Sequence, residues 1–182
     1  SKDVEPLRNL KSKYGTYFVT GNHEYYSGAL QWVDKVHELG MIHLENEHRI
    51  LTRGEASLAI AGVTDLMAHH TIKSHKTNPH KAMRGIPDDM PSIMLAHQPA
   101  TAELTQDLAI DLMLCGHTHG GQFMPFNLAV ARAHKYYAGL YVHDKMQVYV
   151  NRGTGYWGPP LRLGIPSEIT LINLESDVSG MS

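Results

Sequence analysis

Hydrophobic positions along the chain follow helix-like spacing in some segments and strand-like runs in others. Apolar side chains three or four residues apart predict helices over 4–14 and 29–39, the second ending at Gly40. Shorter helices are expected near 79–84 and 101–107. Runs rich in β-branched, aromatic and apolar residues predict strands over 16–20, 41–44, 48–52, 57–64, 92–96, 111–115, 147–152 and 168–174.

Two long segments carry weaker patterns. Residues 65–91 contain several turn-forming residues and are expected to form a long loop around the short helix near 79–84. Residues 123–146 are expected to be irregular or partly helical. The layout as a whole is α/β, and a chain of 182 residues is long enough for one domain with a substantial core.

Composition narrows the classes of function. A net charge of −2 gives no electrostatic footprint for nucleic acid or for an anionic membrane surface. No apolar run approaches the roughly 20 residues of a spanning helix. Cys115 is the only cysteine, so an internal disulfide is excluded and the compartment is left open. The 13 histidines are the unusual count, because histidine is the commonest metal ligand.

Polar side chains that bind metals follow three of the predicted strands. Asn22 follows the first, His97 follows the strand over 92–96, and the pair His117 and His119 follows the strand over 111–115. In α/β sheets, sites form beyond the carboxyl ends of strands. Imidazole suits zinc-, iron- and manganese-type ions, and a carboxamide oxygen can join them. The sequence therefore predicts that these four residues bind metal, with the neighbouring glycines keeping bulk away from the ligands.

His23 and Glu24 complete the expected catalytic group. If Asn22 holds a metal, His23 lies beside the substrate, where it could protonate a leaving oxygen or stabilise phosphoryl charge. Glu24 could orient that imidazole and raise its pKa. Arg152 and Arg162 flank an aromatic loop and are candidates for contacting a substrate phosphate.

The remaining histidines have more ordinary interpretations. Four of them fall in the 65–91 segment and are expected to be solvated, with a substrate rim or adventitious metal site as the alternative: His69, His70, His75 and His80. Three are expected at the surface: His37, His43 and His48. Packing is the default for His134 and His143. Tyr25, Tyr26, Tyr156 and Trp157 are expected either to form an apolar wall, which would suit a lipid-like or aromatic substrate, or to pack in the core.

Three motifs together carry a resemblance to a known family. GNHE at 21–24, the histidine of LAHQP at 95–99 and GHTH at 116–119 resemble the motifs of the calcineurin-like metallophosphoesterases. GNHEYYSG, GHTHGGQ and GTGYWGPP are similar to a bacterial, often membrane-attached branch. The resemblance covers about residues 4–174. It implies a sandwich of two β-sheets flanked by helices (αββα layers) and two divalent metal ions of unknown identity, Mn, Fe or Zn.

The resemblance also assigns roles. It implies that Asn22, His97 and His117 bind one metal and His119 the other, and that His23 assists the leaving group with Glu24 beside it. The implied reaction is in-line attack of a metal-bound hydroxide on a phosphate mono- or diester of a small molecule or lipid. No organic cofactor is implied.

Two motifs of the family have no match in this sequence. The family pattern begins with Asp-x-His and Gly-Asp-x-x-Asp, but no Asp here has His two residues later and no Gly is followed by Asp. We therefore expect residues 1–176 to form the C-terminal part of the domain, lacking its N-terminal metal-binding strands, and 177–182 to form a tail. The chain alone is expected to be weakly active or inactive, with exposed strand edges prone to association. Any membrane attachment or export signal is expected upstream, and the oligomeric state is open.

Two other classes of function compete with the phosphoesterase. The chain could be a degenerate, non-catalytic module that binds a phosphorylated ligand or a partner. A structural zinc site fits poorly, because such sites prefer closed sets of four ligands rich in cysteine.

Overall fold

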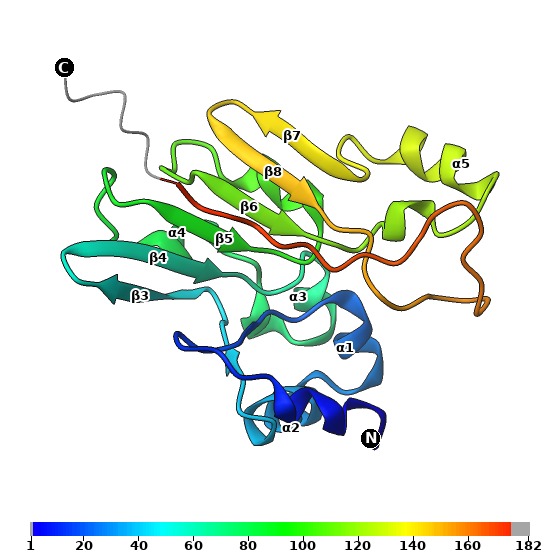
Figure 1. Ribbon diagram of the computed structural model, residues 1–182, viewed down its shortest axis with the longest axis horizontal. Helices are drawn as coiled ribbons and strands as arrows, with labels where there is room; N and C mark the ends of the chain where they lie inside the picture. Colours follow the sequence, from blue (N-terminus) through cyan, green and yellow to red (C-terminus); the bar gives the residue numbers. More distant parts are fainter. Residues whose placement is uncertain (1, 176–182) are drawn as a thin grey trace.

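A six-stranded sheet forms the centre of the protein, seen in a computed structural model that describes residues 2–175 (Figure 1). Four of its strands are parallel, and an antiparallel strand closes each edge. In spatial order the strands are β3 (Glu47–Arg53), β4 (Ala56–Gly62), β5 (Ser92–Leu95), β6 (Leu112–Cys115), β8 (Met146–Val150) and β7 (Gly139–His143).

A second, smaller sheet packs against one face of the first. It consists of the parallel strands β1 (Tyr17–Phe18) and β2 (Ile42–His43). The core between the sheets is aliphatic, with Leu44 meeting Ile60, Ile93 and Leu112 of the larger sheet. Alternate side chains of a strand point to opposite faces, so these central strands, which are apolar on both faces, are buried on both sides.

Helices cover the outer faces of the two sheets. The α-helices are α1 (Asn22–Ser27), α2 (Ala29–Glu38), α3 (Ala68–Thr71), α4 (Pro79–Met83) and α5 (Phe126–Ala133). The 3₁₀ helices are η1 (Lys2–Asn9), η2 (Lys73–His75), η3 (Pro99–Leu104) and η4 (His119–Gly121). Helix α2 packs on β2, whereas α4 and η3 contribute Ala82, Met83 and Ala102 to the core on the far face of the larger sheet. The expected order of helix, sheet, sheet and helix is confirmed.

Most predicted elements are present, and several differ. The predicted helix over 4–14 is a 3₁₀ helix over Lys2–Asn9 with Pro6 inside it, because proline lacks an N–H donor and disfavours a continuous α-helix. Strand β7 lies within residues 123–146, a segment that was expected to be irregular or partly helical. Helices α3 and η2 add to α4 within 65–91.

The predicted strand over 168–174 is wrong. No ladder partner pairs with it among the described residues, and Ile169 and Leu171 are 89% and 88% exposed. Its polar side chains Glu168 and Thr170 instead bond to Tyr149 of β8. A strand-like pattern needs a neighbouring backbone to become a strand, and residues 2–175 supply none for this segment. The predicted tail 177–182 lies outside the described residues.

Among residues 2–175, no helix combines the length and the apolar character needed to cross a membrane.

Candidate metal centre

The parallel strands bring chemically active side chains to one edge of the larger sheet. Asp65 comes soon after β4, His97 follows β5, His117 follows β6 and Asn151 follows β8. Hydrogen bonds from Gly116 N–H to the His97 carbonyl and from Asn151 N–H to the Cys115 carbonyl continue the ladder past the strand ends. The expected convergence of strand ends is therefore present.

Asn22, His97 and His117 come together in one cluster. Asn22 Oδ1 lies 3.0 Å from His97 Nε2, and His117 Nδ1 lies 3.2 Å from the same nitrogen. Two ligands that bind an octahedral ion at right angles, each about 2.1 Å from the ion, lie about 3.0 Å from each other. The two distances in the cluster match this spacing. Glycine at position 21 permits this approach, because a Cβ there would lie 2.9 Å from the His97 ring.

The imidazoles of the cluster are held neutral. Burial, followed by the neighbouring His117, His119 and His23, lowers the pKa of His97 to about 3. Burial also lowers the pKa of His117, which the Asp65 carboxylate partly offsets. A neutral imidazole keeps the lone pair that metal binding requires, so the electrostatics of the cluster favour ligation over protonation.

The cluster fits part of the coordination sphere of one divalent ion. Its three donors are uncharged, and residues 2–175 contain no group of three His, Cys, Asp or Glu side chains arranged to hold a metal. A second ion would need further donors beside His119, and the described residues do not assemble them.

His119 is engaged by the aromatic loop that follows β8. Arg162 Nη2 lies 3.2 Å from His119 Nδ1, while the same guanidinium donates to the carbonyls of Gly155 at 2.7 Å and Arg152 at 2.7 Å. Burial and then the Arg162 charge lower the pKa of His119, against a hydrogen bond with the Gly155 carbonyl. Arg162 therefore fastens the loop to His119.

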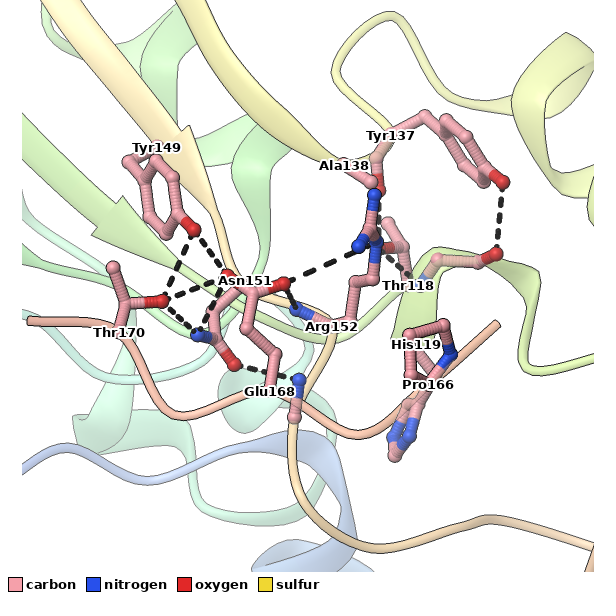
Figure 2. A network of polar contacts seen from close by, with 12 residues as sticks. Thr118, His119, Tyr137, Ala138, Tyr149, Asn151, Arg152, Pro166, Glu168 and Thr170 are labelled. Carbon is pink, nitrogen blue, oxygen red and sulfur yellow. Dashed lines mark hydrogen bonds and ion pairs between the residues drawn. The ribbon is translucent and has the colours of Figure 1, made fainter. Parts of the chain in front are cut away.

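Arg152 and its neighbours form a polar network that adjoins this loop (Figure 2). Glu168 accepts hydrogen bonds from Tyr149 and Thr170, and from Asn151 Nδ2 at 3.2 Å, while Arg152 Nε lies 3.9 Å from its carboxylate. Burial raises the pKa of Glu168, but the bonds from Tyr149 and Thr170 outweigh it and leave the pKa lowered. Arg162 is thus bonded within its loop and Arg152 lies beside Glu168, and a role with substrate stays a prediction for both.

His23 and Glu24 occupy the first turn of α1 with different surroundings. His23 is exposed, and its ring lies 5.7 Å from that of Tyr26. Glu24 turns back, so that its Oε2 accepts the Gly21 N–H at 2.6 Å. Burial raises the pKa of Glu24, and this backbone hydrogen bond opposes the rise. Glu24 caps the helix carrying Asn22 and His23; its expected action on His23 stays a prediction.

Two supporting residues were not singled out from the sequence. The Asp65 side chain is buried, and both of its oxygens accept from Gln98 Nε2, at 3.0 and 2.9 Å, beside His97. Gln122 is fully buried: its Nε2 donates to the Trp157 carbonyl at 2.9 Å and its Oε1 accepts the Trp157 N–H at 2.7 Å. The position of Asp65 after a strand was an available signal, whereas no local pattern marks Gln122.

Several other histidines differ from the sequence-based expectation. His43 is buried rather than at the surface, and its Nε2 has no hydrogen-bond partner among the described residues. His75 is buried rather than solvated, with Nδ1 2.9 Å from Tyr25 Oη. His134 lies beside the cluster, its ring 5.9 Å from that of His117. Long-range packing places all three, which local patterning does not report.

The cluster opens into a cavity of about 690 Å³. One side is polar and includes His23, His97 and His117. Another part of the lining is formed by α5 and by Tyr156 and Trp157. A volume of this size suits a small-molecule ligand rather than phosphate alone.

Comparisons with known proteins bear on the family of this chain. The sequence profile of the calcineurin-like phosphoesterases matches residues 2–121. The chain is 42% identical to a transmembrane protein with metallophosphoesterase domain from Bos taurus over 95% of this chain and 41% of that protein. It is also 42% identical to an uncharacterized metallophosphoesterase from Helicobacter pylori, over 93% of this chain and 45% of that protein.

These relatives come from animals and bacteria, and the chain spans less than half the length of each. The sulfate thiohydrolase SoxB of Thermus thermophilus shares the fold, with a TM-score of 0.53 at 15% identity over 74% of this chain and 27% of that one. By profile and by relatives, the chain belongs to the calcineurin-like phosphoesterase family.

Proposed function

We propose that this chain carries the active-site face of a metal-dependent phosphoesterase that hydrolyses a phosphate mono- or diester. The observation that carries the proposal is the convergence of Asn22 Oδ1, His97 Nε2 and His117 Nδ1 on one wall of the cavity, at 3.0 and 3.2 Å. Bound there, a divalent ion of the Mn, Fe or Zn type would supply Lewis acidity to a phosphoryl oxygen and acidify water.

Each functional residue of the chain has its own role in the proposed reaction. Asn22, His97 and His117 hold the first ion, and His119 contributes to a second ion together with donors from outside the described residues. Exposed His23, at the start of α1, donates a proton to the leaving oxygen of the ester. Glu24 keeps the first turn of α1 in place through its bond to Gly21, which fixes Asn22 and His23 relative to each other.

One observation favours a second candidate, a non-catalytic module that binds a phosphorylated ligand. The donors of the cluster are all neutral, and neutral donors alone hold a dication less firmly than a set with carboxylates. As some relatives are named transmembrane proteins, we also propose that the complete protein is membrane-attached or exported.

Hydrolysis of a chromogenic phosphate ester with added manganese tests the enzyme proposal. The 182-residue chain and the full-length product of the same gene should be assayed in parallel, each with an Asn22→Ala variant and an exposed-surface control, His80→Ala. We expect turnover by the full-length product that Asn22→Ala abolishes and His80→Ala preserves, with weak or no turnover by the 182-residue chain.

Two results would count against these proposals. Undiminished turnover in Asn22→Ala would remove Asn22 from the site. Metal-dependent binding of phosphate without turnover of any ester by the full-length product would support the non-catalytic module instead.

A further inference from the structure

The lining of the cavity beside the cluster has two parts of different character. One part is polar and carries His97 and His117, and the other is a wall built by α5 and Trp157. The apolar residues of that wall are Phe126, Ala129, Val130, Ala133, Tyr156 and Trp157.

Helix α5 presents one face to the cavity. Phe126, Ala129, Val130 and Ala133 are spaced at i, i+3, i+4 and i+7, which places them on one side of an α-helix. None of the residues of α5 is buried, so this apolar face is not covered by the rest of the described chain. The face is therefore available to a ligand in the cavity.

Trp157 is held in the wall by contacts that reach back to the histidine motif. Gln122 bonds both the N–H and the carbonyl of Trp157, and Phe126 lies 5.9 Å from the indole ring. The Gln122 N–H in turn donates to the His119 carbonyl at 3.1 Å. The main chain of Trp157 is therefore anchored to the segment that carries His119, while the residue remains 39% exposed.

The charges around the cavity argue against a highly polar ligand. Within the described residues its lining includes no Lys or Arg, and its one carboxylate, Glu24, is bonded to Gly21. Arg162 is engaged with His119 and backbone carbonyls, and Arg152 Nε lies 3.9 Å from Glu168. A second anionic group, as in a nucleoside diphosphate, would meet no lysine or arginine in this lining, and the alanines and valine of α5 offer no side-chain hydrogen bond to a sugar or base.

We propose, building on the phosphoesterase function above, that the wall formed by α5 and Trp157 binds the hydrocarbon chain of an amphiphilic phosphate ester. The substrate class is then a phosphate ester of a long-chain or lipid alcohol, with the phosphate at His97 and His117 and the chain along α5. The favourable free energy of transfer grows roughly in proportion to the apolar area buried, so binding should strengthen with chain length.

Fluorescence of Trp157 provides a binding readout that is independent of turnover. The chain has two tryptophans, so a Trp32→Phe background leaves Trp157 as the only reporter. Ethyl, butyl and octyl phosphate would be titrated below their micelle concentrations, with inorganic phosphate and AMP as comparisons. We expect the Kd of octyl phosphate to be at least about tenfold below that of butyl phosphate, since each buried methylene contributes up to about fourfold.

Matched variants on α5 assign the effect to the wall. Val130→Asn, which makes the wall polar without adding a charge beside the phosphate, should weaken the dependence on chain length while leaving binding of inorganic phosphate unchanged. Leu128→Asn, on the same helix but outside the cavity lining and 67% exposed, should behave as the parent. Ala129→Leu, which keeps the surface apolar but fills the cavity, should weaken octyl phosphate more than ethyl phosphate and serves if Val130→Asn fails to fold.

The outcomes separate this inference from the proposed function. Equal affinity for ethyl and octyl phosphate, or tighter binding of AMP than of octyl phosphate, would overturn the inference. Metal-dependent hydrolysis that ignores chain length would overturn it while the phosphoesterase stands. Binding that strengthens with chain length, without hydrolysis by the full-length product, would support the wall and refute the enzyme.

Discussion

The carboxamide oxygen of Asn22 lies 3.0 Å from Nε2 of His97, although 75 positions separate the two residues in the sequence. The first belongs to the helix after β1 of the small sheet, and the second follows β5 of the large sheet. Their meeting therefore depends on the packing of the two sheets. A metal bound by both would tie the sheets together at this edge.

Removal of either imidazole of the cluster should weaken metal binding. We expect His97→Ala and His117→Ala each to raise the Kd for Mn²⁺ or Zn²⁺ by more than about tenfold, because a ligand contributes at least as much as the outer-shell groups that support it. Equilibrium dialysis measures this, with His80→Ala as the control. Unchanged affinity in both variants would show that the metal binds elsewhere.

Gly121 should tolerate no side chain. Its φ is +73°, and a Cβ would lie 2.3 Å from the Cα of Asn127 at the start of α5. Gly85, with φ +89° and open space around it, is the matched control. Gly85→Ala should cost about 1–2 kcal/mol from backbone strain alone, and Gly121→Ala should cost about 1–3 kcal/mol more from overpacking. Urea unfolding of both variants checks the difference; equal losses would refute the clash.

The loop after β8 should loosen when Arg162 is replaced. Its guanidinium bonds Gly155, Arg152 and His119 in a planar fork that lysine cannot reproduce. Arg162→Met and Arg162→Lys should both lower the free energy of unfolding by about 1–3 kcal/mol and speed proteolysis within 153–160. Arg132→Met, on the exposed end of α5, should change stability by less than about 0.5 kcal/mol. Full stability in Arg162→Lys would argue that charge alone holds the loop.

Stability should fall as the pH drops below about 6.5. Burial lowers the pKa of His43, and burial with neighbouring histidines lowers that of His97 to about 3. Each of these histidines thus has a lower pKa in the folded state than in the unfolded state. Between its folded and unfolded pKa values, the unfolded state binds more protons, so the free energy of unfolding rises with pH. The stability is fully recovered above the unfolded pKa of about 6.5.

The variant His43→Phe isolates one contribution to this dependence. Phenylalanine keeps the ring volume in β2 but cannot titrate, so the slope of unfolding free energy against pH should flatten below pH 6.5. Thermal melts from pH 5 to 8 in metal-free buffer measure it. An unchanged slope would assign the dependence to the other histidines.

The local hydrophobic pattern was sufficient to predict the helices and strands that bury an apolar run. The helix α2 and the strands β4, β5 and β6 lie where hydrophobic spacing predicts them, and polar residues that follow the last two are those of the cluster. This follows because a parallel central strand must be apolar along its length and can carry polar chemistry only where it ends.

Contacts between segments that are distant in the sequence determine the remaining features of the fold and the site. Residues 168–174 have the composition of a strand but find no backbone to pair with among residues 2–175, whereas β7 forms because β8 lies beside it. His43 is buried by the packing of other segments, and Arg162 bonds the carbonyls of Gly155 and Arg152 in a loop that Gln122 holds in place. Hydrophobic periodicity reports what a segment can bury, but pairing, burial and hydrogen bonding are properties of two segments, and only the tertiary structure supplies the second.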